Sequence, residues 1–305
     1  MKRVLVTGAA GSLGLLVIKY LLSEGKYEVT ALDLRNKLTN RQLKRYKKRI
    51  NIIYGDIADT ALMEELVREH DIIIHLASVM PPLGELNKRL GEIVEYSGTE
   101  NIIKAINYYN SDCFLIYAST TSLTDKEKFS NKDKINEKTL NNYATNKYNT
   151  ENLIKRKLKN YSIIRLPLIL NNVLHDPFMY NIKKSSIVSY VTNVDAAYAF
   201  VKAIDYKKEI NKKTYNIMSE KPILYDKLLK KILINCGISF KYIIGRVFLE
   251  KNFYSPIIVD NDLEQVIDYK YDSLNKYLRR LKRVGKKRYI RKILAKPLIW
   301  LKNKE

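Results

Sequence analysis

The chain has 305 residues, 46% of them hydrophobic, and a formal net charge of +23 at pH 7. These values are ordinary for a globular protein with a large core, and the sequence has no run of about eighteen apolar residues that would predict a membrane-spanning helix. A predicted strand begins almost at the N-terminus, so no signal peptide is expected. The two cysteines, Cys113 and Cys236, have no metal-type spacing, and we expect buried thiols in a reducing cytosol and no metal site.

The positive charge is concentrated near the C-terminus. Thirteen Lys or Arg and one acidic residue lie between Lys276 and Glu305, so this stretch carries +12 of the +23. Abundant Lys, Asn, Ile and Tyr are typical of an AT-rich genome, and no nucleic-acid partner is expected. Residues 286–305 form a basic amphipathic tail, interrupted at Pro297, that predicts either peripheral contact with an anionic membrane or a docked C-terminal helix.

Strand and helix patterns alternate along the first half of the chain. The predicted strands cover 4–6, 28–32, 50–54, 71–77, 113–118 and 162–166, and the predicted helices cover 13–21, 61–69, 98–107 and 143–158. A weaker helical pattern covers 226–233. This alternation predicts an α/β fold with a doubly wound parallel sheet, in which ligands bind at the carboxyl ends of the strands.

A glycine-rich turn follows the first predicted strand. Its sequence is Thr7-Gly8-Ala9-Ala10-Gly11-Ser12-Leu13-Gly14. Glycine lets a backbone approach a pyrophosphate closely, and the N–H groups of the following helix point at the phosphates. A strand, a glycine turn and a helix in this order predict a dinucleotide site.

Acidic residues follow the next two predicted strands. Asp33 stands where a carboxylate can accept hydrogen bonds from both ribose hydroxyls of the adenosine half, which favours NAD over NADP. Arg35 could pair with a 2′-phosphate, so NADP is not excluded, and a solvated loop acid is the alternative for Asp33. Asp56 either bonds the adenine amino group or forms a turn, and His75 is expected to be a packed strand histidine.

Tyr143 and Lys147 lie four residues apart on a predicted helix and therefore share one face. A lysine ammonium favours the phenolate form of a nearby tyrosine, which makes the tyrosine usable for proton transfer. Because the chain has 23 tyrosines and many lysines, this spacing can also arise by chance. This Tyr–Lys pair follows the fifth predicted strand and the hydroxyl residues Ser119-Thr120-Thr121 at its end. That position makes the spacing a more specific signal than the two residue types alone.

The combined motifs resemble those of the extended short-chain dehydrogenases/reductases, the NAD-dependent epimerase/dehydratase family. They are Thr7-Gly8-x-x-Gly11-x-x-Gly14, Asp33, Gly55-Asp56, His75-Leu76-Ala77, Ser119-Thr120 and Tyr143-x-x-x-Lys147. Two later segments, 193–197 and 214–217, also resemble the family, and the resemblance covers residues 1 to about 220. It implies a Rossmann-type sheet with a small C-terminal substrate-binding region.

The resemblance implies a role for each motif residue. Tyr143 would be the general acid/base, Lys147 would hold the nicotinamide ribose, and Thr120 would bond the reacting oxygen, with Ser119 and Thr121 as rivals. The cofactor would contact Gly8, Ala10, Gly11, Ser12, Leu13, Gly14, Asp33, Arg35, Asp56, Ile57, Leu76, Ala77, Ser78, Lys147 and Pro167. The implied activity is that of an NAD(P)-dependent oxidoreductase or epimerase acting on a nucleotide sugar through a 4-keto intermediate, in bacterial polysaccharide synthesis.

The sequence also departs from the family pattern. Leu123-Thr124-Asp125 stands where Val-Tyr-Gly is common, and Glu95 occupies the region of a usual Asn. No Asp-Glu pair follows Thr120, which argues against a dTDP-glucose 4,6-dehydratase. The stretch between 167 and 194 is short, which makes a UDP-hexose 4-epimerase uncertain.

These departures leave two alternatives open: a non-catalytic NAD-binding scaffold, and a membrane-associated reductase of a lipid-like substrate. We expect an NAD-binding domain over 1–165, to which 187–217 returns, and a substrate-binding region over 166–186 and 218–285. Arg246, Lys251, Tyr254 and Arg279 are candidate contacts to a substrate diphosphate, with solvated surface as the alternative for each. A cytoplasmic location is expected, with the inner membrane face and a homodimer left open.

Overall fold

The structure is a computed structural model that describes residues 1–171, 182–236 and 256–288. Its centre is a seven-stranded sheet in the order β11-β7-β5-β4-β1-β2-β3, with every neighbouring pair parallel. The strands are β1 (Lys2–Thr7), β2 (Tyr27–Asp33), β3 (Asn51–Tyr54), β4 (Ile72–His75), β5 (Phe114–Thr120), β7 (Tyr161–Leu166) and β11 (Lys213–Asn216). The predicted doubly wound α/β fold is confirmed.

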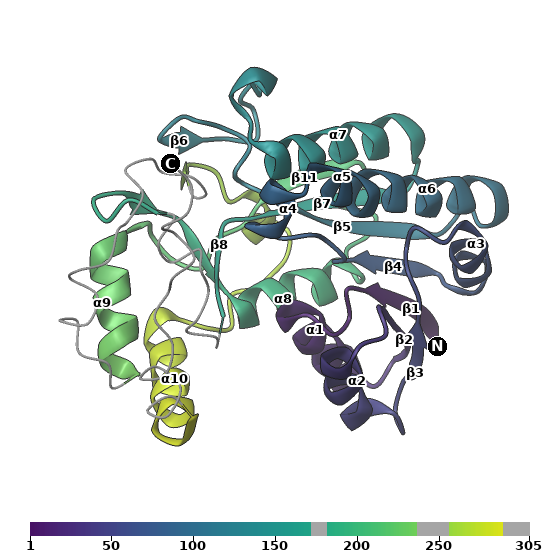
Figure 1. The fold of residues 1–305 in the computed structure, drawn as a ribbon, viewed down its shortest axis with the longest axis horizontal. Helices are drawn as coiled ribbons and strands as arrows, with labels where there is room; N and C mark the ends of the chain where they lie inside the picture. The colour runs from purple at the N-terminus through teal and green to yellow at the C-terminus, as the bar shows by residue number, and fades with distance from the viewer. Residues whose placement is uncertain (172–181, 237–255, 289–305) are drawn as a thin grey trace.

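Helices cover both faces of the sheet (Figure 1). One face carries α1 (Ser12–Glu24), α2 (Lys37–Leu43) and α8 (Asn193–Ala203), and the other carries α3 (Thr60–Glu69), α6 (Gly98–Tyr109) and α7 (Asn142–Lys157). The strands between these layers are continuous apolar runs such as Ile72-Ile73-Ile74, all fully buried, as expected for strands covered on both faces.

Strand order reverses direction at β1. The chain proceeds outward from β1 through β2 to β3 and then returns to the other side of β1 as β4. Ligands in such sheets bind at the carboxyl ends of the strands beside this reversal. The strand β4 ends at His75, two residues earlier than predicted, so Leu76, Ala77 and Ser78 follow the strand in a loop at that place.

Short elements lie in the connections between the longer helices and strands. They are α4 (Leu83–Leu86), α5 (Lys88–Glu92), the π-helical turn η2 (Ile93–Ser97), and the 3₁₀ turns η1 (Lys44–Tyr46), η3 (Glu137–Thr139) and η6 (Asp262–Gln265). Three small sheets pair β8 (Leu168–Leu170) with β10 (Tyr190–Thr192), β9 (Ile187–Val188) with β12 (Ile223–Leu224), and β6 (Lys128–Phe129) with β13 (Ile257–Ile258). The sequence patterns did not predict these pairings, because each strand has only two or three residues.

A further hydrophobic cluster, separate from those on the two faces of the sheet, lies around α9 (Tyr225–Asn235) and α10 (Leu274–Arg288). Figure 1 shows these two helices side by side at one end of the molecule. Both cysteines are buried and free, as predicted. Within the described ranges, no helix combines the length and the apolar character needed to cross a membrane.

Candidate active site

The glycine turn packs against the end of β4. Gly8 has a φ of 64°, and a Cβ there would lie 2.7 Å from the backbone nitrogen of Ala77. A Cβ on Gly14 would lie 2.5 Å from the carbonyl oxygen of Gly8. Helix α1 begins after Gly11, and no side chain in the described part of the chain caps it. The N–H groups of its first turn are therefore placed to receive an anion, as a bound pyrophosphate requires.

Asp33 lies beside this turn, as predicted. Its Oδ2 accepts a hydrogen bond from the Ala10 amide at 2.8 Å, and its Oδ1 accepts one from Leu34 at 2.8 Å. Burial raises the pKa of the Asp33 carboxyl, and the two amides act against that rise. A carboxylate has about four acceptor positions, so two remain for ribose hydroxyls. The Arg35 guanidinium lies 4.8 Å from the centre of the Tyr54 ring.

Two further predicted cofactor residues occur in the β3–α3 loop. Asp56 accepts a hydrogen bond from the Ala58 amide at 3.0 Å and thus forms the turn that was its alternative role. Ile57 is buried and packs against α6 at Gly98, where a Cβ would meet its Cδ1 at 2.6 Å. A contact between Asp56 and adenine stays a prediction.

His75 is a packed strand histidine, as expected. It is fully buried, with Nδ1 2.6 Å from Thr7 Oγ1 and Nε2 2.9 Å from Thr99 Oγ1. Burial, and after it the charge of Lys147, lower the pKa of His75 to about 3. The ring is therefore neutral at physiological pH, and it ties β1 to α6 beneath the site.

The helix that carries Tyr143 is fixed at its start by two side chains. Asn141 accepts a hydrogen bond from the Ala144 amide at 2.8 Å, and Glu85 of α4 accepts one from the Tyr143 amide at 2.9 Å. The Tyr143 hydroxyl lies 3.7 Å from Met80 Sδ. The loop after β4 thus contacts the hydroxyl of Tyr143, and α4, which follows that loop, contacts its backbone.

Lys147 lies on the same face of α7 as Tyr143. Its Nζ is 6.0 Å from the centre of the Tyr143 ring and donates a hydrogen bond to the Ala118 carbonyl at 2.7 Å. Ala118 directly precedes Ser119 and Thr120 on β5, so the lysine joins α7 to the strand end that carries the third predicted catalytic residue.

Lys147 also forms an ion pair that the sequence motifs did not predict. Its Nζ lies 2.6 Å from Glu95 Oε1, and the two side chains are 3% and 2% exposed. Tyr117 donates to the same oxygen at 2.7 Å, and Ser78 donates to Oε2 at 2.6 Å. In the sequence, the one sign of this pair is that Glu95 occupies the region where the family usually has an Asn.

The hydroxyls at the end of β5 have different partners. Ser119 donates to Glu151 Oε1 at 2.6 Å and therefore belongs to a buried ion-pair network. The Thr120 hydroxyl lies 3.1 Å from Ser122 Oγ, and Thr121 Oγ1 is buried without a hydrogen-bond partner. Of the three, Thr120 is therefore kept as the candidate, and its contact with a substrate stays a prediction.

The remaining predicted residues fall into two groups. Ser12 donates to Asn171 at 3.1 Å, and Leu13 and Pro167 are buried beside the glycine turn and after β7. Arg279 is exposed on α10, whereas Arg246, Lys251, Tyr254 and the tail from residue 289 lie outside the described residues. Among the residues that are described, no group of His, Cys, Asp or Glu could hold a metal ion.

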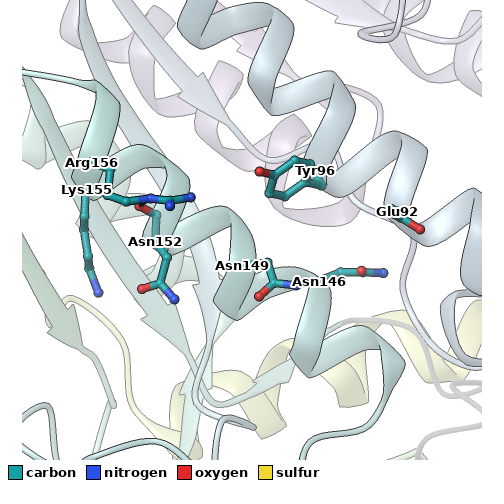
Figure 2. Close-up of a pocket in the computed structure, with 7 residues that line it drawn as sticks. All are labelled: Glu92, Tyr96, Asn146, Asn149, Asn152, Lys155 and Arg156. Atoms are coloured by element: carbon teal, nitrogen blue, oxygen red, sulfur yellow. Dashed lines mark hydrogen bonds between the residues drawn. The ribbon is translucent and has the colours of Figure 1, made fainter. Parts of the chain in front are cut away.

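A polar groove of about 510 Å³ lies on the other side of α7 (Figure 2). It is lined by Glu92, Tyr96, Asn146, Asn149, Asn152, Lys155 and Arg156. Helical spacing puts most of these α7 residues opposite Tyr143 and Lys147. The groove is therefore separate from the candidate active site.

The family model for the 3-beta hydroxysteroid dehydrogenase/isomerase family matches residues 5–165, which is more than half of the chain. The chain belongs to this family. The resemblance to the extended short-chain dehydrogenases/reductases is thereby confirmed. The match includes the glycine turn, Asp33, Thr120, Tyr143 and Lys147.

Individual relatives are more distant. A UDP-N-acetyl-alpha-D-glucosaminuronate decarboxylase from Bacillus cytotoxicus is 32% identical over 127 residues, which are 41% of this chain and 38% of that enzyme. The chain thus matches less than half the length of this curated relative. A dTDP-glucose 4,6-dehydratase from Streptomyces venezuelae, solved with NAD, has a TM-score of 0.80 at 17% identity over 94% and 97% of the two chains. A UDP-glucuronic acid 4-epimerase from Bacillus cereus, also solved with NAD, has a TM-score of 0.76 at 19% identity over 93% and 99%. These structures establish a shared fold.

Proposed function

We propose that the protein is an NAD-dependent oxidoreductase or epimerase that acts on a nucleotide sugar through a 4-keto intermediate. The observation that carries this proposal is the arrangement at the strand ends. The glycine turn and Asp33 end two strands, and Lys147 links Tyr143 to the end of β5. A turn suited to a dinucleotide therefore lies at the same edge of the sheet, the carboxyl ends of the strands, as a tyrosine suited to proton transfer. The relatives with nucleotide-sugar substrates support the substrate class.

The chain offers a distinct contact for each part of NAD. The first turn of α1 would hold the pyrophosphate, Asp33 the adenosine ribose, and Lys147 the nicotinamide ribose. Bound NAD would supply the acceptor and donor of a hydride. Asp33 would repel a 2′-phosphate, which favours NAD over NADP.

The protein's own part in the reaction is proton transfer and orientation. Tyr143 would take the proton from a sugar hydroxyl as that carbon is oxidised, and it would return a proton when the keto group is reduced. The Thr120 hydroxyl would bond the reacting oxygen. Neither Thr121 nor Ser122 can serve as the acid that loss of water from the sugar would need, so we favour epimerisation or keto reduction.

The substrate class can be tested with a panel of nucleotide sugars. The purified protein would be incubated with NAD and UDP-glucose, UDP-glucuronic acid, UDP-N-acetylglucosamine or dTDP-glucose, and the products would be identified by mass spectrometry and NMR. We expect conversion of at least one sugar, and much slower conversion of that sugar by Tyr143→Phe. Retention of NAD without turnover of any member would instead support a non-catalytic scaffold.

One surface feature favours a second candidate, the reductase of a lipid-like substrate. Met80 in the loop after β4 and Leu83 and Leu86 of α4 are 52%, 53% and 53% exposed, and this segment contacts Tyr143 through Met80 and Glu85. An apolar substrate would cover these side chains, whereas a nucleotide sugar has less apolar surface to offer. A 3-hydroxysteroid added to the panel would separate the two candidates, because turnover of the steroid alone would overturn the nucleotide-sugar proposal.

The assembly and the location of the protein are also proposals. We retain a homodimer and a peripheral membrane contact through the basic tail as predictions, together with the division into an NAD-binding domain and a substrate-binding region. Mass photometry tests the dimer. Liposome binding of the full chain against a chain that lacks 286–305 tests the tail, and equal partition would overturn the membrane contact.

A further inference from the structure

The ion pair between Glu95 and Lys147 has a consequence for the chemistry of Tyr143. A lysine ammonium beside a tyrosine favours the phenolate because its positive charge stabilises the negative one. In this protein the ammonium has a buried carboxylate at 2.6 Å, and it also bonds the Ala118 carbonyl. The negative charge of Glu95 therefore offsets much of the stabilisation that the Lys147 ammonium would give to a Tyr143 phenolate.

Glu95 is held by hydrogen bonds to both its side chain and its backbone carbonyl. Its carboxylate accepts hydrogen bonds from Tyr117 and Ser78, and its carbonyl oxygen accepts them from Thr99 at 2.5 Å and Thr150 at 3.2 Å. It lies in the π-helical turn Ile93–Ser97, and such single turns recur at functional sites. The carboxylate is thus a fixed part of the scaffold behind α7.

The other ionisable groups around Tyr143 and Lys147 do not replace Glu95 in this role. His75 is neutral, because burial and Lys147 lower its pKa to about 3. Glu151 is paired with Arg165, and Glu85 accepts from the Tyr143 amide. Burial first, and then Glu95, raise the pKa of Tyr117, so this tyrosine stays protonated and donates.

We propose that Glu95 is a positioning residue that holds the Lys147 ammonium in place and offsets its charge, so that Tyr143 keeps its proton to a higher pH than it would beside an unpaired lysine. This inference rests on the proposed function of Tyr143 as the acid/base. It implies that the resting tyrosine is a proton donor at neutral pH, which suits reduction of a keto sugar. Oxidation of a sugar hydroxyl would be favoured at alkaline pH.

The experiment measures the tyrosinate absorbance of the protein without cofactor as the pH rises. Subtracting the titration of the matching Tyr143→Phe variant isolates Tyr143. Several other tyrosines contribute little at mildly alkaline pH, because burial raises the pKa of Tyr20 and of Tyr27 to about 12. In Glu95→Gln, which removes the charge and keeps the shape, the Tyr143 phenolate should form about one pH unit or more lower than in the wild type.

Two further variants keep the test decisive. Tyr117→Phe removes one hydrogen bond to Glu95 but leaves its charge, so its midpoint should stay near that of the wild type. Glu95→Asn replaces the carboxylate by the residue type usual in the family, and it should shift the midpoint in the same direction as Glu95→Gln. It therefore provides the test if Glu95→Gln does not fold. The same shift should appear in the pH profile of kcat/KM for the sugar found in the panel.

An unchanged Tyr143 midpoint in both Glu95 variants would overturn the inference. An equal shift in Tyr117→Phe would also overturn it, since the effect would then follow from a disturbed pocket. Because the titration needs neither cofactor nor substrate, it can be read even if no sugar is converted. Failure of the proposed function and failure of this inference are therefore distinguishable.

Discussion

Arg165 Nη2 lies 2.6 Å from Glu151 Oε2, and its Nε lies 2.8 Å from Oε1 of the same carboxylate. Glu151 is fully buried on α7, and Arg165 lies near the end of β7. Ser119 of β5 donates to the same carboxylate at 2.6 Å. This bidentate ion pair and the Ser119 hydrogen bond join α7, the helix that carries Tyr143, to the strands β7 and β5.

Removal of the Glu151 charge should destabilise the protein at neutral pH. Glu151→Gln leaves Arg165 buried without its counter-ion, and loss of one partner of a buried pair costs about 3–5 kcal/mol. The exposed pair of Glu100 and Lys104 provides the control, because Glu100→Gln should cost about 0.5 kcal/mol or less. Urea unfolding measures both differences.

The cost of Glu151→Gln should also depend on pH. Burial alone would raise the pKa of Glu151, but Arg165, Lys155 and Ser119 outweigh it and hold the pKa at about 2, below the ordinary 4.5. The ionised carboxylate therefore contributes its full stability above about pH 4.5, and this contribution falls as the pH falls toward 2. The gap between wild type and variant should narrow over that window, and a constant gap would contradict the assignment.

His75 should remain neutral well below its ordinary titration range. Its pKa is lowered from 6.5 to about 3, so a neutral ring contributes stability above pH 6.5 that is lost as the pH falls toward 3. With three histidines in the chain, nitrogen NMR can assign this ring, and it should show no protonation at about pH 5. A midpoint near 6.5 in the folded protein would contradict the buried arrangement.

Gly8→Ala should disrupt the turn more than Gly25→Ala does. Both glycines have positive φ, 64° and 68°, so alanine costs about 1–2 kcal/mol at each. At Gly25 the added Cβ meets nothing within 4 Å, whereas at Gly8 it meets the Ala77 nitrogen at 2.7 Å. Thermal unfolding should show a larger loss for Gly8→Ala, and calorimetry should show weakened NAD binding for that variant alone. Equal losses at the two positions would contradict the close approach.

Asp33→Asn should change the choice of cofactor. The amide removes the charge that would repel a 2′-phosphate and one acceptor for the ribose, so NAD should bind more weakly and the preference over NADP should shrink. Titration calorimetry with both dinucleotides measures the ratio. If both affinities fell by the same factor, Asp33 would not be the residue that discriminates between them.

Local patterns predicted much of the fold and of the candidate site. The glycine turn and the Tyr143–Lys147 spacing depend on residues close in sequence, and Asp33 is placed by the strand it ends. The partners of Lys147 and Ser119 could not be read in this way. Glu95 and Glu151 lie 52 and 32 residues from them, and an acidic residue on a helix ordinarily faces solvent.

The short elements were missed for a related reason. The segment from Met80 to Leu86, which includes the one-turn helix α4, contacts Tyr143 through Met80 and through the Glu85 carboxylate, and neither contact has a periodic pattern. The two-residue strands β6 and β13 pair over more than 120 residues of chain. Such contacts follow from tertiary packing and have no local signal.

The most direct test of the proposed function is the turnover of Tyr143→Phe with NAD and the sugar identified in the panel. Phenylalanine fills the same space but cannot transfer a proton, so turnover should fall about 10²–10⁴-fold, while the dissociation constant of NAD stays close to that of the wild type. Turnover at the wild-type rate would contradict the assignment of Tyr143 as the acid/base.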